Sequence, residues 1–426
     1  MIPLVESLMR KELDGLRNRE DAFAKSLLPK SDLASAVHGV VENGEVAKFV
    51  QDNSDSDEFN EFDHLINREM VRHAQRFFAT FGLQIGAALV HHALPDSYAA
   101  ARGAQVLYLT GQLVSDPARR VRETTQFILT VMTPATGQDR GLDAPTTLHP
   151  GRPGAVAARR IRFFHQAVRN FVHERCADQW AGITKYFQKE IDPSGPELGE
   201  PLNQEDLLGT LHEFTVGVFE SLAILGVPYS SDDQAAWYHV WDIVGRHMGI
   251  GTESAFSPGG SQTRIDANMQ SFLPLDPTMS AETLAVIRRR HHLESVEGTI
   301  LTNALLAELE RPLPRGLKPF PASLMRYLLG SATADLLGIT RGGWFQELLL
   351  SLHSVPRIAD MARRRRSGAL ARWTTGELSS VATQHLLQSF TDEGRSGNRT
   401  FEVSSQLRNA WGLNPGRDSR DLVPAP

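Results

Sequence analysis

The sequence predicts an all-α protein, built as a single large domain of roughly a dozen helices. Over most of the chain the apolar residues recur at the three- and four-residue spacing of amphipathic helices. No segment shows the sustained alternation of apolar and polar residues that marks a strand. Breaks rich in Pro and Gly divide the chain into pieces whose lengths are typical of globular helices.

The first half of the chain divides at clear start and stop signals. We expect helices over 5–28, 59–90, 98–108 and 119–131, and we expect the segment His91–Pro95 to end the second of them. Asp116 and Pro117 make a good start for the fourth, because proline is favoured in the first helical turn. The segment 133–154 then reads as a loop, long enough to suggest a function.

In the second half, a long central helix is expected over 156–187. The segment that begins at Asn203 is expected to form the capped start of a helix. Further helices are predicted over 207–225, 232–247, 281–309 and 322–336. The end of the chain is rich in Gly, Asn and Pro and predicts a poorly ordered tail. We therefore place one domain at residues 1–390 and the tail at 391–426.

Composition excludes several classes of function. The net charge is −6 and the pI is near 6.2, so nothing favours binding to nucleic acid. Cys176 is the only cysteine, which rules out an intrachain disulfide and a multi-cysteine zinc site. No apolar run reaches the length of a membrane span, and no secretion signal begins the chain, so a cytoplasmic location is expected. The sequence gives no indication of the oligomeric state.

Four other motifs have simpler explanations. The acidic run 52–58 lacks the glycine and the closing glutamate of a calcium loop. The segment 249–254 has two glycines of a dinucleotide fingerprint but no preceding strand. The run 363–366 reads as a solvated helix end. His291 and His292, with Glu294 and Glu297, could ligate a metal, but a polar helix face is the more frequent explanation of such a pattern.

The central helix carries the pattern with the most chemical content. Arg162, His165 and Arg169 stand at positions i, i+3 and i+7 within the apolar decapeptide Arg160–Arg169, so they share one face. An imidazole between two guanidinium groups suits haem, because the imidazole can ligate iron and the arginines can pair with the propionates. The alternative is a packed, hydrogen-bonded core histidine.

Several short motifs together resemble the latex-clearing protein and mpaB-type family of haem oxygenases. Each is short, but their order and spacing over residues 60–350 match. They are Tyr98-Ala99-Ala100-x-x-Gly103, Leu107-x-x-Thr110-Gly111, Arg119-Arg120-Val121-Arg122-Glu123-Thr124, Arg162-x-x-His165-x-x-x-Arg169, Leu202-Asn203-Gln204-Glu205-Asp206-Leu207, Trp241-x-x-x-Gly245-x-x-x-Gly249 and Met325-Arg326-Tyr327-Leu328-Leu329-Gly330.

The resemblance implies globin-like helix packing and one haem b held without a covalent bond. His165 matches the proximal iron ligand of the family, and Arg162 and Arg169 match the arginines that flank it. Arg326 is a weaker candidate for the same cofactor.

On the distal side of the haem, the resemblance implies a shell of Arg120, Glu123 and Thr124. The rubber-cleaving members carry Arg-x-x-Lys-Thr there, and Glu123 replaces the lysine. We find no acid at the spacing of the distal base of those members. With no secretion signal, polyisoprene is an unexpected substrate.

We therefore expect a haem b-dependent oxygenase that activates O₂ to oxidise or cleave an apolar, unsaturated small molecule. Two alternatives stay open at this point. One is a haem-binding sensor or redox protein without turnover, and the other is a helical scaffold without a cofactor.

Overall fold

A computed structural model of the chain describes residues 63–109, 117–134, 144–191, 193, 198–250 and 274–340. These residues form twelve α-helical segments, a few short 3₁₀ and π turns, and a single isolated bridge between Ala100 and His292. The prediction of an all-α fold with about a dozen helices is therefore confirmed. The expected helix at 5–28, the acidic run 52–58, the run 363–366 and the tail 391–426 lie outside the described residues.

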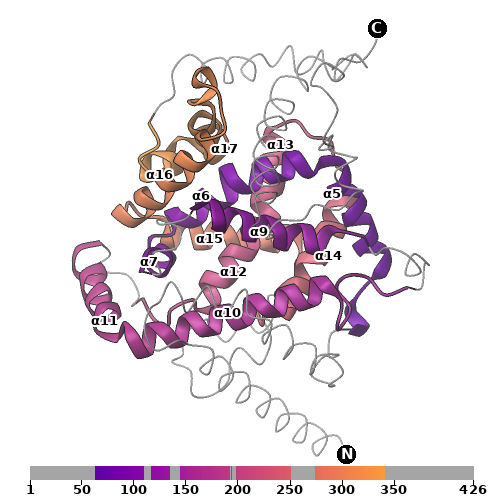
Figure 1. Cartoon of the computed structure of the whole chain (residues 1–426), viewed down its shortest axis with the longest axis horizontal. Helices are drawn as coiled ribbons and strands as arrows, with labels where there is room; N and C mark the ends of the chain where they lie inside the picture. The colour runs from indigo at the N-terminus through magenta and orange to yellow at the C-terminus, as the bar shows by residue number, and fades with distance from the viewer. Residues whose placement is uncertain are drawn as a thin grey trace, which may run out of the picture.

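The packing of α5 (Arg68–Ala88) against α14 (Ser231–His247) forms the centre of the fold (Figure 1). The Asn67 side chain caps α5 by accepting from two backbone amides of its first turn. Ser230 and Asp233 form a reciprocal capping box at the start of α14. Between the two helices lie Phe77, Phe78 and Trp237, whose rings contact one another. Asn67 also donates its backbone N–H to His239 of α14, over 3.0 Å.

Two long helical stretches contribute to this core, and each contains a π turn. The first runs through α5, the π turn η2 (Leu89–Ala93) and α6 (Leu94–Ala99). The second runs through α12 (Gln204–His212), the π turn η5 (Glu213–Gly217) and α13 (Val218–Ile224). The expectation that His91–Pro95 ends a helix is wrong, because the wider π turn carries the helix through those residues.

These same two stretches, Arg68–Ala99 and Gln204–Ile224, are long and apolar enough to cross a membrane by length and composition. The sequence reading had found no such run. About two thirds of each apolar window is buried inside the fold, at 61% and 67%. Their apolar character is accounted for by the core that they form.

A second layer places α9 (Pro117–Met132) alongside α10 (Pro153–Arg175), which runs along one side of the molecule in Figure 1. Helix α9 begins at Pro117, as predicted. The central helix does not run unbroken to residue 187, because Cys176 has a non-helical backbone and a new helix follows it. That helix is α11 (Ala177–Tyr186), which continues into the π turn η4 (Phe187–Ile191).

The remaining helices cover the other end of the core. They are α7 (Ala101–Leu109), α15 (Pro277–His291), α16 (Val296–Glu310) and α17 (Phe320–Leu336), with the 3₁₀ turn η7 (Arg315–Leu317) before the last. The sequence predicted one helix over 281–309. The structure divides it at 292–295, where Ser295 caps a new helix by accepting from the Gly298 amide.

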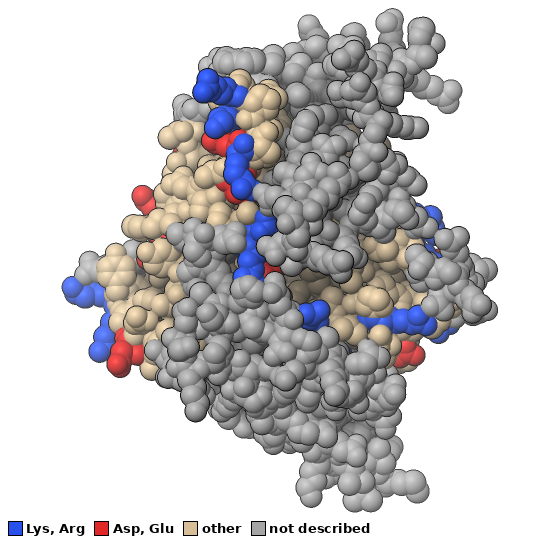
Figure 2. Space-filling view, viewed as in Figure 1, with Lys and Arg blue, Asp and Glu red and all other residues tan. Residues whose placement is uncertain are grey.

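The described surface carries charges of both signs. On the face drawn in Figure 2, Lys and Arg side chains lie beside Asp and Glu side chains over the described helices. The charge pattern of that part of the face is therefore mixed.

Candidate functional site

One stripe of α9 faces an apolar cavity. Val121, Thr124, Thr125 and Ile128, at positions i, i+3, i+4 and i+7 of the helix, line it together with residues of α5, η2, α6, α12 and η5. The cavity has a volume of about 60 Å³, and eleven of its sixteen lining residues are aliphatic, aromatic or glycine. Thr124 supplies one of its few hydroxyl groups. This apolar cavity can take a small apolar molecule or part of a longer one.

Glu123, the next residue before Thr124, is not among the residues that line the cavity. Its carboxylate accepts from the Nε atom of Arg119 over 2.8 Å and lies 3.6 Å from Arg120. Arg119 stands four residues before Glu123 on α9, and Arg120 stands three residues before it. Glu123 is thus held by two cations beside the stripe that faces the cavity.

Arg120 connects α9 to α10. Its guanidinium group lies over the ring of Phe164, 5.4 Å from the ring centre. It is also close enough to His165, the next residue on α10, to lower the pKa of the imidazole. Of the three predicted distal residues, Thr124 lines the cavity, Arg120 lies near His165, and Glu123 lies outside the cavity lining.

His165 is held as a neutral imidazole. Burial, followed by the charges of Arg120 and Arg169, lowers its pKa to about 3. Its Nδ1 atom is buried and has no hydrogen-bond partner among the described residues. A carbonyl or carboxylate that accepts from Nδ1 would orient this ring, and the described residues offer none. A neutral imidazole with arginines one turn to either side is a donor set that fits haem.

The two arginines beside His165 also hold neighbouring segments in place. Arg169 donates to the carbonyl oxygens of Pro201 and Leu202, just before α12, over 3.2 and 2.8 Å. Arg162 lies against Gly249, where an added β-carbon would come 3.4 Å from the guanidinium carbon. Gly249 ends α14 with a positive φ of 76°, so this glycine serves the turn as well as the close approach.

Arg326 lies on a different element from the other three candidates for haem binding. It is buried in α17, where it donates to the Asp335 carboxylate over 2.6 Å and to the Ile339 carbonyl over 2.8 Å. Both partners lie on the same helix or in the turn that follows it. These contacts give Arg326 a structural role, which the sequence motif did not indicate.

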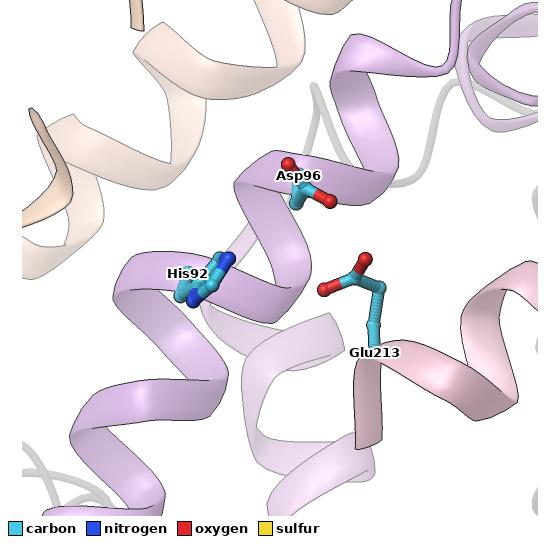
Figure 3. Close-up of side chains that lie close together, drawn as sticks. All are labelled: His92, Asp96 and Glu213. Atoms are coloured by element: carbon cyan, nitrogen blue, oxygen red, sulfur yellow. The ribbon is translucent and has the colours of Figure 1, made fainter. Parts of the chain in front are cut away.

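A cluster of ionisable residues that the sequence did not single out lies beside the apolar cavity. Figure 3 shows His92 and Asp96 one turn apart on the same helical stretch, with Glu213 facing them from η5. Arg288 of α15 donates to Asp96 over 2.7 Å, to Glu213 over 3.2 Å and to Glu220 over 3.0 Å. Ligand atoms of His92, Asp96 and Glu213 all lie within 4.8 Å of one another.

The guanidinium group of Arg288 already supplies the cation of this cluster. It contacts Asp96, Glu213 and also the Nε2 atom of His92, at 3.3 Å. A metal ion at the same point would have to displace it. The cluster is therefore an arginine-centred ionic network in this structure, and its individual members differ strongly in protonation.

The two carboxyl groups of Asp96 and Glu213 form a coupled pair. Burial and the charge of Asp96 raise the pKa of Glu213 well above its usual value, against the opposing charge of Arg288. For Asp96, burial opposes ionisation, but the hydrogen bond with Glu213 and the charge of Arg288 lower its pKa to about 2. Within this pair, a proton is therefore held more readily by Glu213 than by Asp96.

The histidines considered as metal ligands from the sequence have other partners. His291 lies 3.0 Å from Glu205, and His292 lies 3.7 Å from Asp96. Neither pair includes Glu294 or Glu297. His91 contacts the carbonyl of Ala87 and His92 contacts Ser221, so the two adjacent rings point to different partners, as expected for neighbours on a helix.

The chain matches known proteins in sequence and in structure. A family model described as "ER-bound oxygenase mpaB/B'/Rubber oxygenase, catalytic domain" matches residues 71–373. A rubber oxygenase of Streptomyces sp. (strain K30) is 27% identical over 220 residues, which are 48% of this chain and 46% of that protein. The chain thus spans about half the length of that relative. The latex clearing protein LCP in its closed state matches with a TM-score of 0.51 and 17% identity, over 75% of this chain and 74% of the other.

Proposed function

The chain belongs to the mpaB and rubber oxygenase family of catalytic domains, and from that membership we propose that it is an oxygenase that binds haem b and oxidises or cleaves an apolar, unsaturated small molecule. The observation that carries the proposal is His165, which is buried, neutral and flanked by two arginines on α10. The resemblance found in the sequence agrees with the family match.

The residues of α10 would hold the cofactor. His165 would ligate the iron, and Arg162 and Arg169 would pair with the propionates. Bound haem supplies the iron that O₂ needs for activation. Because the His165 pKa is about 3, the ring is available as a ligand without first losing a proton at neutral pH.

The residues of α9 would act on the substrate side. The largely apolar lining of the cavity favours a molecule without charge, because an ion there would lose much of its hydration. The Thr124 hydroxyl can donate a hydrogen bond at the cavity wall. Arg120 places a positive charge between α9 and His165.

The test combines the visible spectrum of the purified protein with oxygen uptake. Wild type, supplemented with haem, should bind one equivalent and consume O₂ in the presence of squalene, an apolar alkene. His165→Ala should lose haem and stay helical by circular dichroism. His173→Ala, which changes an exposed histidine two turns later on the same helix, serves as the matched control.

The outcomes separate the alternatives. A protein that stays colourless after haem addition would support a scaffold without a cofactor. A protein that binds haem and CO reversibly but takes up no O₂ with any alkene would support a sensor or redox role. Full haem binding by His165→Ala would remove His165 as the ligand.

A further inference from the structure

Two separate spaces lie on either side of the carboxyl pair formed by Asp96 and Glu213. On one side is the apolar cavity of about 60 Å³, and Glu213 is the only acidic or basic residue in its lining. On the other side is a larger polar pocket of about 310 Å³, lined by His92, Asp96, Glu220 and Arg288 with four less polar residues. No residue lines both spaces, but Asp96, which lines the polar pocket, lies close to Glu213, which lines the apolar cavity (Figure 3).

Glu213 lines the apolar cavity and also contacts the ionic network. Its Oε1 atom accepts from Arg288. Its Oε2 atom is buried and has no hydrogen-bond partner among the described residues. Burial, followed by the charge of Asp96, raises the pKa of Glu213, and a proton on Glu213 can go either to the Asp96 carboxylate or to a group in the cavity. A carboxylic acid that keeps its proton at neutral pH beside an apolar space can donate it there.

The backbone makes room for this carboxyl group. Glu213 begins the π turn η5, and a β-carbon on Gly217, one turn later, would overlap its Oε2 atom. His92 lies in the other π turn, η2, which packs against η5. Both π turns therefore contribute to one cluster, and π turns within α-helices occur frequently at functional sites.

The histidine at the polar pocket has a fixed tautomer. The Ser221 hydroxyl donates to the Gly217 carbonyl over 2.9 Å, so its oxygen accepts from the Nδ1–H of His92, over 2.6 Å. The Nε2 atom of His92 is then an acceptor, and it faces Arg288 and, 3.8 Å away, Glu220. Glu220 is 42% exposed, so this side of the network reaches solvent.

We propose that Glu213 exchanges a proton with the molecule bound in the apolar cavity, and that Asp96 passes a replacement to Glu213 from the polar pocket. The proton leaves the carboxyl oxygen of Glu213 for an oxygen atom of the bound molecule, and the carboxylate left behind is reprotonated through Asp96. Glu213 is the catalytic residue of this step, and Asp96 relays the replacement proton to it from the polar pocket. The catalytic part of the proposal rests on the proposed oxygenase function.

The charged groups around Glu213 come from four elements. Asp96 lies on α6, Glu220 on α13, Arg288 on α15 and His92 on η2, and His292 after α15 faces Asp96. Asp96→Asn removes the negative charge nearest to Glu213 and leaves Arg288 in place. The pH at which Glu213 loses its proton should therefore fall in that variant.

The first test is infrared spectroscopy of the full chain, which needs neither haem nor turnover. Wild type at neutral pH should show the carbonyl band of a protonated carboxyl group, and the band should be lost in Glu213→Gln. Glu308→Gln, at a buried glutamate of α16 paired with Arg311, should keep it. Gly217→Ala leaves Glu213 present but displaces its carboxyl group, and should shift or remove the band. In Asp96→Asn the band should vanish at a lower pH than in wild type.

A second measurement tests contact with the cavity. Cyclopentanone should shift the Glu213 band, because the acid can donate to the ketone oxygen, whereas cyclopentane should leave it unchanged. If the protein takes up oxygen with squalene, Glu213→Gln should lower kcat on the order of 10²-fold, and Glu308→Gln should not change it.

The results distinguish this inference from the proposed function. If Glu213→Gln keeps the carbonyl band of wild type, or if cyclopentanone does not shift that band, the inference is overturned even in a fully active oxygenase. A protein with the band and the ketone response but no oxygen uptake would overturn the oxygenase proposal and keep the proton exchange. Equal kcat in Glu213→Gln and wild type would remove Glu213 from the reaction.

Discussion

Arg119 donates from its Nε atom to the carboxylate of Glu123 over 2.8 Å, one turn further along α9. Arg120 approaches the other carboxylate oxygen at 3.6 Å. Two positive charges thus surround Glu123. This residue stands where the family resemblance places a lysine in the rubber-cleaving members. Glu123 also lies outside the lining of the apolar cavity. The negative charge of Glu123 is therefore neutralised by the two arginines and does not face the cavity.

Glu123→Gln should therefore have modest effects. Loss of two partly exposed ion pairs should lower the free energy of unfolding by about 0.2–1 kcal/mol, measured by urea denaturation. The midpoint potential of bound haem should change little, because Glu123 lies outside the cavity lining and is paired with two arginines. Glu282→Gln, at an exposed glutamate of α15, is the control. A large shift of the midpoint in Glu123→Gln alone would show that this carboxylate does act on the iron.

Arg169→Ala and Arg162→Ala should differ in one respect. Both should weaken haem retention, measured by transfer to apomyoglobin, because a propionate loses a charged partner. Arg169→Ala should also lower the stability of the haem-free protein by about 1–3 kcal/mol, because the carbonyl groups of Pro201 and Leu202 lose their donor. Unchanged haem retention in both variants would argue against propionate binding by α10.

Replacing each of two helical glycines by alanine should change the stability of the protein in opposite directions. A β-carbon on Gly298 of α16 would come 2.6 Å from the carbonyl oxygen of Tyr98, and a backbone atom cannot easily move away. Gly298→Ala should cost about 1–3 kcal/mol of stability. Gly182 of α11 has nothing within 4 Å of the same point, so Gly182→Ala should gain about 0.5–1 kcal/mol. Thermal denaturation of both variants shows whether each substitution raises or lowers the stability of the protein.

Stability should fall in acid partly because of His212. Burial lowers its pKa from 6.5 to about 4, and neither ring nitrogen has a partner among the described residues. The unfolded chain therefore takes up a proton at higher pH than the folded protein does. The contribution of His212 is fully present above pH 6.5 and is lost as the pH falls toward about 4.

Between pH 7 and pH 4, the free energy of unfolding should fall less in His212→Leu than in wild type, by on the order of 3 kcal/mol. Urea denaturation at several pH values measures the slope. His64→Leu, at an exposed histidine, should leave the slope as it is in wild type. If the two variants gave the same slope, His212 would not be neutral in the folded protein at pH 7.

Local signals in the sequence predicted much of the fold. Proline at 117 and the Asn203 cap, whose side chain accepts from the Asp206 amide, begin helices where expected. Apolar periodicity located the helices but could not show the π turns η2 and η5, because buried apolar residues continue on both sides of each turn. The division at 292–295 was missed for a related reason, since the apolar pattern continues through the break.

The candidate site was predictable where it lies on one helix. Arg162, His165 and Arg169 share a face of α10 because of their spacing alone. The network of Asp96, Glu213 and Arg288 was not predictable, because its members come from three separate helices and Arg288 is 192 residues from Asp96. Burial sets the protonation of such groups, and burial is decided only when the distant helices pack together.

The pairing of α5 with α14 also has a consequence for synthesis of the chain. Asn67 and His239, which join these helices, are 172 residues apart. At a synthesis rate of about 5–20 residues per second, α14 leaves the ribosome on the order of ten seconds or more after α5. During that interval, Phe77 and Phe78 of α5 lack Trp237, their ring partner in α14. The nascent chain therefore depends on shielding of this helix, and slowed translation between the two helices should increase its aggregation.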